Sequence, residues 1–321
     1  MKRLAVAIAV LVLAAWLEMA TGQAGFGVPD FFTESGLRNP IFELRFLRTL
    51  AALTVGGALA VSGMILQAVL RNPLADPFIL GISGGAAAGA GVVMFTGLAA
   101  VSALAVSIGS FAGAAGVLFL VLWLARGDAS GERMLLSGVM AGAVAGAVLM
   151  CLTAFADDTR KVAGLAWWML GDLQIPRSEM LYPAMAVTLG GTLTAYVFSR
   201  SLNAVALGRE SAFYVGCNAD RTIRNFVLLA ALMTAMTVSL AGIIGFCGLV
   251  VPHMVRRLAG GENRSTVWLT FVWGAIFLAL ADSLAGGLIP GMELPLGVVT
   301  TLAGGPVFLW ILNRREGRLE N

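Results

Sequence analysis

Long apolar runs, separated by short polar or glycine- and proline-containing breaks, follow one another along the whole chain of 321 residues. Most runs approach about 20 residues, the length that an α-helix needs to cross a bilayer. The pattern predicts about ten membrane-spanning helices, at residues 3–20, 46–70, 80–95, 99–124, 134–155, 180–198, 222–243, 246–258, 267–285 and 296–312. The eighth run is short for a complete crossing. Two further stretches, 163–170 and 286–290, are too short to span and are expected to be re-entrant or interfacial.

Composition supports this interpretation. Hydrophobic residues make up 59% of the chain and charged residues only 12%, whereas a soluble domain carries about 25% charged residues. The 40 glycines lie largely inside the apolar runs, where they let helix backbones approach closely. We therefore expect an all-α polytopic membrane protein, with residues 1–321 forming a single transmembrane domain. The net charge of +3 gives no argument for nucleic-acid binding.

The basic residues predict an orientation. Lys2 and Arg3 precede the first apolar run, as in a signal peptide, and a cleavage site after Ala20 or Ala24 would fit. A chain with so many later spans can equally retain this run as its first helix, which is our expectation. With the N-terminus inside, only six of the 21 basic residues fall on the outer side: Arg38, Arg45, Arg48, Arg160, Lys161 and Arg177. By the positive-inside rule, both termini are predicted to be cytoplasmic, in the inner (cytoplasmic) membrane.

Residues for catalysis or metal binding are sparse. The only lysines, Lys2 and Lys161, do not follow a phosphate-binding GxxxxG, so this chain is not expected to bind ATP by a P-loop. The single histidine, His253, has no HExxH motif, and a position at a helix end is expected for it more than a metal or general-base role. Cys151, Cys217 and Cys247 lack CxxC spacing and are interpreted as small apolar residues. We predict no catalytic, metal or cofactor site in this chain.

Two carboxylates fall inside the apolar runs. Glu18 and Asp282 both lie in the last turn at the predicted outer end. Ion-coupled carriers hold titratable groups at mid-membrane, and Asp282 is the only plausible member of such a set. It is otherwise interpreted as a hydrogen-bonding anchor. A membrane-embedded enzyme would need a cluster of reactive side chains that the sequence does not provide.

The segment between the second and third runs reads RNPLADPFILG, residues 71–81. Pro73 and Pro77 forbid one continuous helix, because each lacks an N–H and restricts the residue before it. Asn72 and Asp76 can satisfy exposed backbone groups at the break. This segment is predicted to be a tight turn at the inner face, followed by a helix rich in small residues.

Three strings together carry a family resemblance. RNPLADPFILGISGGAAAG (71–89), GFCGLVVPHMVRR (245–257) and Ala281-Asp282 followed by ELPLGVVT (293–300) and GPVF (305–308) resemble signatures of the type II ABC importer permeases for iron siderophores, haem and cobalamin. The resemblance covers nearly the whole chain in order. Within these strings the residues of unassigned role are Pro252, His253, Asp282, Glu293 and Pro295.

The resemblance implies a cobalamin-importer-permease-like subunit of about ten transmembrane helices. It further implies a homodimer that works with two ATP-binding subunits and an extracytoplasmic substrate-binding protein. ATP and Mg²⁺ would belong to the partner ATPase, so this chain would be a transport subunit and not an enzyme. The expected cargo is an iron–siderophore complex, with haem and cobalamin as alternatives and an ion-coupled secondary transporter as a remote one.

An inner loop at about residues 203–221 is similar to the coupling loop that contacts the ATPase in importer permeases. The residues that match its E-x-A-x-x-x-G pattern and its start are Arg209, Glu210, Ser211, Ala212 and Gly216. A short helix ended by a glycine can insert into a partner as a rigid knob. The alternative is an ordinary amphipathic connector.

Two further expectations follow from the resemblance. Arg45 and Arg48 share a helix face and resemble sockets for glutamates of the binding protein; the alternative is a pair of snorkelling arginines. Many relatives carry a third arginine where this chain has Gly286.

In the fifth span, Gly138, Gly142 and Gly146 form two overlapping GxxxG steps. The family places this helix along the translocation path, although packing within the subunit would explain the glycines equally well.

Overall fold

The computed structural model describes residues 2–20, 40–100, 102, 104–125, 131–173, 178–289 and 292–316. Within these ranges the chain is almost entirely helical, and the only β-type pairing is an isolated bridge between Ile289 and Met292. The helices are α1 (Lys2–Ala20), α3 (Pro40–Val69), η2 (Pro77–Leu80), α4 (Ile82–Phe95), η3 (Leu98–Ala100), α5 (Leu104–Leu124), α6 (Gly131–Ala154), α7 (Thr159–Met169), α8 (Ser178–Val197), α9 (Ser199–Leu207), α10 (Arg209–Tyr214), α11 (Ala219–Ala241), α12 (Cys247–Ala259), α13 (Asn263–Gly287) and α14 (Leu296–Glu316).

The predicted spans are confirmed as helices. In the described part of the chain, α1, α3, α5, α6, α8, α11 and α13 are long and apolar enough to cross a membrane, and α4 and α14 are shorter apolar helices. The protein is therefore an all-α, multi-pass membrane protein. The stretch 163–170 falls within α7, a separate short helix.

Two predicted boundaries differ from the structure. α3 begins at Pro40, six residues before the predicted start, so that Arg45 and Arg48 belong to a regular helix. The stretch 286–290 is not an element of its own, because Gly286 and Gly287 complete the last turn of α13. Arg38, Arg126, Arg177, Pro290 and Arg318 lie outside the described residues.

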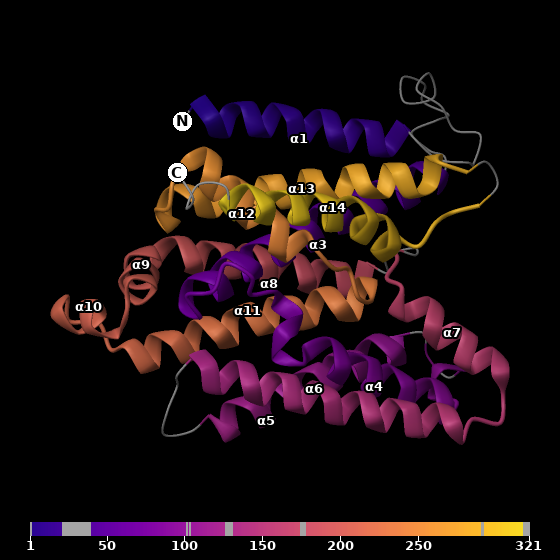
Figure 1. Ribbon diagram of the computed structural model, residues 1–321. Helices are drawn as coiled ribbons and strands as arrows, with labels where there is room; N and C mark the ends of the chain where they lie inside the picture. Colours follow the sequence, from indigo (N-terminus) through magenta and orange to yellow (C-terminus); the bar gives the residue numbers. More distant parts are fainter. Residues whose placement is uncertain are drawn as a thin grey trace.

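The helices run roughly along one common direction, with α3 near the centre (Figure 1). Close packing around α3 depends on glycine pairs. A Cβ at Gly63 would collide with the carbonyl group of Gly248 in α12, and one at Gly56 would collide with the carbonyl oxygen of Gly274 in α13. This is the small-residue packing expected of membrane helices.

The helix break after α3 is confirmed. The side-chain oxygen of Asn72 accepts the N–H of Leu74 at 2.9 Å, and that of Asp76 accepts the N–H of Phe78 at 2.8 Å. Pro77 opens η2, and Pro73 lies in the turn before it. Both polar side chains thus replace helical hydrogen bonds that the prolines remove.

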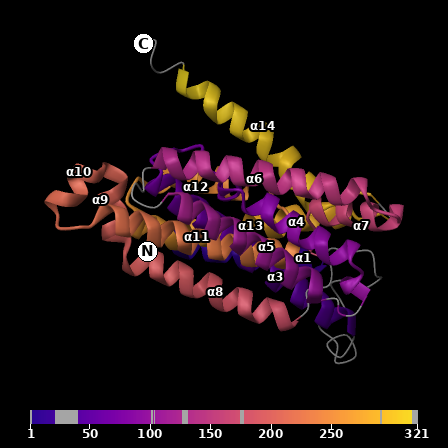
Figure 2. The ribbon, with the colours of Figure 1, turned by 90° about the horizontal axis from the view of Figure 1, so that it is seen from below.

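The two ends of the bundle differ. The start of α1 and the end of α14 lie at the end where α9 and α10 protrude, and α7 lies at the opposite end (Figure 1). We name these the inner end and the outer end, after the orientation predicted from the basic residues. Figure 2 shows a second asymmetry: α14 and α6 lie along one side of the bundle, α8 lies along the opposite side, and α14 diverges from the rest.

Candidate docking, coupling and pathway sites

Arg48 is the centre of a charged cluster at the outer end. Its Nε donates to Oδ2 of Asp282 at 2.7 Å and its Nη2 donates to Oδ1 of the same carboxylate at 3.0 Å. Its Nη1 donates to Oε2 of Glu293 at 3.0 Å, and Oδ1 of Asp172 lies 3.9 Å from Nη2. Bidentate pairing of this kind fixes orientation as well as distance.

The members of this Arg48 cluster come from distant parts of the chain. Arg48 lies in the third turn of α3, and Asp282 lies in α13, one turn before its end. Glu293 follows the Ile289–Met292 bridge. Asp172 follows Gly171, and its N–H donates to the carbonyl of Ala241 at the end of α11.

Exposure separates the two strong partners of Arg48. The side chain of Asp282 is only 3% exposed, whereas that of Glu293 is 49% exposed. Burying Asp282 without a partner would be costly, so the geometry favours the interpretation of Asp282 as an anchor over an ion-coupling role. The geometry also argues against simple snorkelling of Arg48.

Sequence reasoning did not place Asp172 or Glu18 in this cluster. Glu18, buried near the end of α1, interacts electrostatically with both Asp282 and Arg48. The sequence did contain a signal for Glu18, because this residue, like Asp282, is a carboxylate at the outer end of an apolar run. Nothing in the local sequence marks Asp172 as a neighbour of Arg48.

Arg45 lies one helical turn before Arg48 but has a different environment. Its Nη1 donates to the carbonyl oxygen of Met19 at 2.9 Å, which ties α3 to the end of α1. Gly286 lies one turn after Asp282, and a Cβ there would meet no atom within 4 Å. The structure thus leaves space at the outer end for a side chain that this sequence lacks.

At the inner end, the predicted coupling loop forms two short helices, α9 and α10, joined at Gly208. Gly216 has φ 73° and ends α10. Its N–H donates to the carbonyl of Phe213, and the N–H of Cys217 donates to the carbonyl of Ala212. This double hydrogen bond is the Schellman motif, so the prediction of a short helix ended by Gly216 is confirmed.

The tip of α10 presents apolar side chains to its surroundings. Phe213 is 78% exposed and Tyr214 is 85% exposed, and their rings contact each other edge-on with centroids 6.2 Å apart. Ala212, in the same helix, is fully buried. Arg209 pairs with Asp220 in the first turn of α11 at 2.7 Å, while Glu210 and Ser211 lie in the first turn of α10. A rigid protrusion with an aromatic tip can insert into a groove of another protein.

The three glycines of α6 have different surroundings. A Cβ at Gly138 would lie 2.7 Å from the Cα of Leu80, and one at Gly142 would lie 3.1 Å from the Cα of Gly81. Both glycines therefore let α6 pack against the break before α4 within the subunit. Gly146 differs, because a Cβ there would meet no atom within 4 Å.

The remaining motif residues support the bundle locally. Pro252 is buried within α12, and His253 beside it is half-buried. Pro295 is buried just before α14, where its carbonyl accepts the N–H groups of Val298 and Val299. These positions give no indication of a reactive centre.

Apolar helices packed through glycines, with a rigid helical protrusion at one end, form the architecture of a membrane permease subunit. The chain belongs to the FecCD transport family, whose family model matches residues 7–314. As a member of this family it is an ABC importer permease and not an enzyme.

Individual relatives agree with this assignment. The chain is 38% identical over 281 residues to the hemin transport system permease protein HmuU of Yersinia pestis, covering 86% of this chain and 84% of the relative. It is 37% identical over 295 residues to the cobalamin import system permease protein BtuC of Halobacterium salinarum, covering 91% and 77%. The fold matches a solved chain assigned to the metal-chelate type of ABC transporter in an inward-facing conformation, with TM-score 0.86, 27% identity, and coverage of 97% and 98%.

Proposed function

We propose that this protein imports a metal chelate across the cytoplasmic membrane as the permease of an ATP-driven complex. The observation that carries the proposal is the α9–α10 protrusion, whose exposed Phe213 and Tyr214 form a docking knob at the inner end. ATP and Mg²⁺ belong to two ATP-binding subunits that receive this knob.

The cargo in this proposal is a ferric siderophore, with haem and cobalamin as alternatives. The names of two relatives, a hemin permease and a cobalamin permease, support the alternatives. All three solutes are bulky chelates, which suits a path between apolar helices. Selection among them would rest with the binding protein.

The second copy of the chain is proposed to pack on the side of α14 and α6. Figure 2 shows α14 leaving the bundle on that side, and large apolar side chains of both helices are exposed there, among them Leu302 at 70% and Val144 at 60%. The open space beside Gly146 allows a close approach of another helix. The translocation path would then run between the two copies.

Docking of the binding protein is proposed at the outer end, around Arg45 and Arg48. Because Asp282 already holds two donors of Arg48, the exposed Glu293 is the partner that an incoming carboxylate can replace. Docking at Arg48 would therefore exchange one carboxylate for another. This predicts a modest affinity that depends on ionic strength.

The test is reconstitution of the permease with its ATPase and binding protein in liposomes. Uptake of ferric siderophore, haemin and cobalamin is measured with and without ATP. ATP-dependent uptake of one chelate supports the proposal, and the accepted chelate identifies the cargo. Uptake by the lone chain in ATP-free vesicles under a proton gradient would instead establish a secondary transporter.

A further inference from the structure

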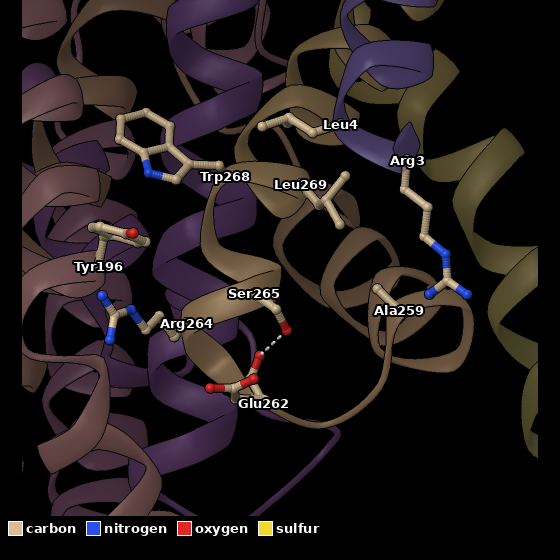
Figure 3. A pocket seen from close by; sticks show the side chains of 9 residues that line it. All are labelled: Arg3, Leu4, Tyr196, Ala259, Glu262, Arg264, Ser265, Trp268 and Leu269. Atoms are coloured by element: carbon tan, nitrogen blue, oxygen red, sulfur yellow. Dashed lines mark hydrogen bonds between the residues drawn. The ribbon is translucent and has the colours of Figure 1, made fainter. Parts of the chain in front are cut away.

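A cavity at the inner end, apart from the docking, coupling and pathway sites, combines arginines with an apolar floor. It has a volume of about 730 Å³ and lies between the start of α1, the end of α8, the end of α12 and the start of α13. Pockets that bind small molecules have volumes of about 300–1,000 Å³. Figure 3 shows Arg3 and Arg264 on opposite sides of this α1–α13 cavity.

The two guanidinium groups are held by neutral partners. Nη1 of Arg3 donates to the carbonyl oxygen of Leu258 at 2.8 Å. The guanidinium of Arg264 lies over the ring of Tyr196, 5.5 Å from its centroid. Among the described residues, no carboxylate lies within ion-pair distance of either group. Each arginine has five N–H donors, so both retain donors for an anion.

The floor of the cavity is apolar and aromatic. Leu4 and Leu269 lie between the two arginines in Figure 3, and Trp268 lies above Arg264 beside Tyr196. The ring centroids of Trp268 and Tyr196 are 6.3 Å apart. Tryptophan and tyrosine favour the level of the lipid headgroups at a membrane surface.

One acidic residue, Glu262, belongs to the lining. Its backbone carbonyl accepts the hydroxyl groups of Ser265 and Thr266 at 3.0 and 2.9 Å. Its carboxylate is exposed at the lower rim in Figure 3, on the far side of Ser265 from Leu4. With two arginines and one glutamate, the lining keeps a net positive charge.

One of the elements that border the cavity, α8, lies on the side of the bundle opposite α14 and α6 (Figure 2). That side is left to the lipid when a second copy packs on α14. The cavity also lies at the inner end, facing the leaflet in which anionic lipids produce a negative surface potential.

The geometry points to a binding site for an anionic phospholipid in the α1–α13 cavity. Its anionic headgroup lies between Arg3 and Arg264, which border the cavity on opposite sides, and the first part of its acyl chains lies on Leu4, Leu269 and Trp268. Basic pockets between membrane helices are a known setting for anionic headgroups. A bound lipid would link the start of α1 to the start of α13.

The alternative without a defined site is that both arginines snorkel, extending toward the membrane surface. Such arginines would enrich anionic lipid weakly and without a defined stoichiometry. Arg257 is the matched control, since it is an exposed arginine in the last turn of α12, at the same end of the bundle but outside the lining. A defined lipid site predicts that replacing Arg3 and Arg264 lowers the affinity for anionic lipid and that replacing Arg257 does not.

The experiment measures lipid binding to the purified permease in neutral detergent by native mass spectrometry. Dioleoyl phosphatidylglycerol and tetraoleoyl cardiolipin are titrated against dioleoyl phosphatidylcholine. The wild-type chain is expected to bind one anionic lipid per subunit saturably. The Arg3→Gln, Arg264→Gln double variant should bind it about tenfold more weakly, since each arginine near an anionic lipid contributes a several-fold gain. Arg257→Gln should change the affinity less than about twofold.

Two further arms complete the test. Arg264→Lys keeps the charge but loses the planar stacking on Tyr196, so an intermediate affinity is expected. Inorganic phosphate and glycerol phosphate are added as soluble competitors, and displacement of the lipid at equal concentration would overturn the lipid as the occupant. Equal binding of phosphatidylcholine, or an equal loss in Arg257→Gln, would overturn the site itself. Melting temperatures in detergent without lipid verify that each variant is folded, and no transport assay enters the result.

Discussion

The outer and inner ends of the bundle differ in which side chains are paired within the subunit and which are exposed. At the outer end, Arg48 is surrounded by carboxylates of its own subunit, and its main partner Asp282 is almost completely buried. At the inner end, the charged pair Arg209–Asp220 is exposed, and the aromatic residues Phe213 and Tyr214 project outward. The outer cluster is satisfied internally, whereas the inner tip lacks any covering within the described chain.

This difference indicates how each end meets a partner. A protein that binds the inner tip gains free energy by covering exposed aromatic surface, the usual source of strong interface contacts. A protein that binds the outer end must compete with charges already paired, which gives specificity and orientation more than affinity. We therefore expect a durable contact inside and a weaker, exchangeable one outside.

The largest effect is expected from Asp282→Ala, which removes the buried partner of Arg48. The free energy of unfolding should fall by roughly 2–4 kcal/mol, because the Arg48 charge loses its buried bidentate partner and keeps Glu293 at 3.0 Å and the more distant Asp172 at 3.9 Å. The melting temperature of the purified permease in detergent measures this change. Asp157→Ala is the control, since Asp157 is an exposed acid outside the cluster. A melting temperature equal to that of the control would show that the cluster does not support the fold.

The next effect concerns the inner tip. The double change Phe213→Ala, Tyr214→Ala should weaken ATPase binding by about 2 kcal/mol, or more than tenfold. The fold should be unaffected, because both side chains are at least 78% exposed. Binding of the purified ATPase is measured by surface plasmon resonance on the permease in nanodiscs. Phe155→Ala is the control, since Phe155 is 81% exposed at the outer end; an equal loss in both variants would mean that the tip is not the contact.

A smaller effect is expected from Gly216→Ala. A residue with a Cβ at φ 73° costs roughly 1–2 kcal/mol, which should loosen the end of α10. The ratio of transported chelate to hydrolysed ATP should then fall several-fold while ATPase binding persists. Gly190→Ala in α8 is the matched control, because the added methyl meets no atom within 4 Å. An unchanged ratio in Gly216→Ala would contradict the role of α10 in coupling.

The helices and the shape of the α9–α10 protrusion could be predicted from sequence because their signals are local. Apolar runs of the right length mark the spans, the prolines at 73 and 77 mark the break after α3, and Gly216 marks the end of α10. Each of these features depends on residues within a few positions of one another. The start of α3 was missed because its first turns carry charges, which the apolar pattern does not include.

The outer cluster could not be predicted in the same way. Arg48 and Asp282 are 234 positions apart, and no local pattern indicates that they meet. The family resemblance drew attention to both residues but gave them separate roles. Likewise, the GxxxG pattern in α6 does not reveal that Gly138 packs within the subunit whereas Gly146 faces open space.

The smallest effect is expected from Gly286→Arg, which adds the third arginine that the family resemblance leads us to expect at this position. The new side chain would begin one turn after Asp282, in space that is open to at least 4 Å around its Cβ. From there it can pair with Glu293 or with a carboxylate of the binding protein. Surface pairs contribute about 0.2–1 kcal/mol, so binding-protein affinity should rise no more than about fivefold.

Gly287→Arg is a closely matched control for this change. Gly287 is the next residue, is exposed and is equally open, but it points about 100° further around the helix. Affinity of the binding protein is measured at low and high salt for both variants. A gain for Gly286→Arg alone would show that the outer end accepts a third, positioned charge beside its internally paired cluster. An equal gain for both would mean that docking responds to net charge only, and the outer end would then lack the positional specificity that distinguishes it from the inner tip.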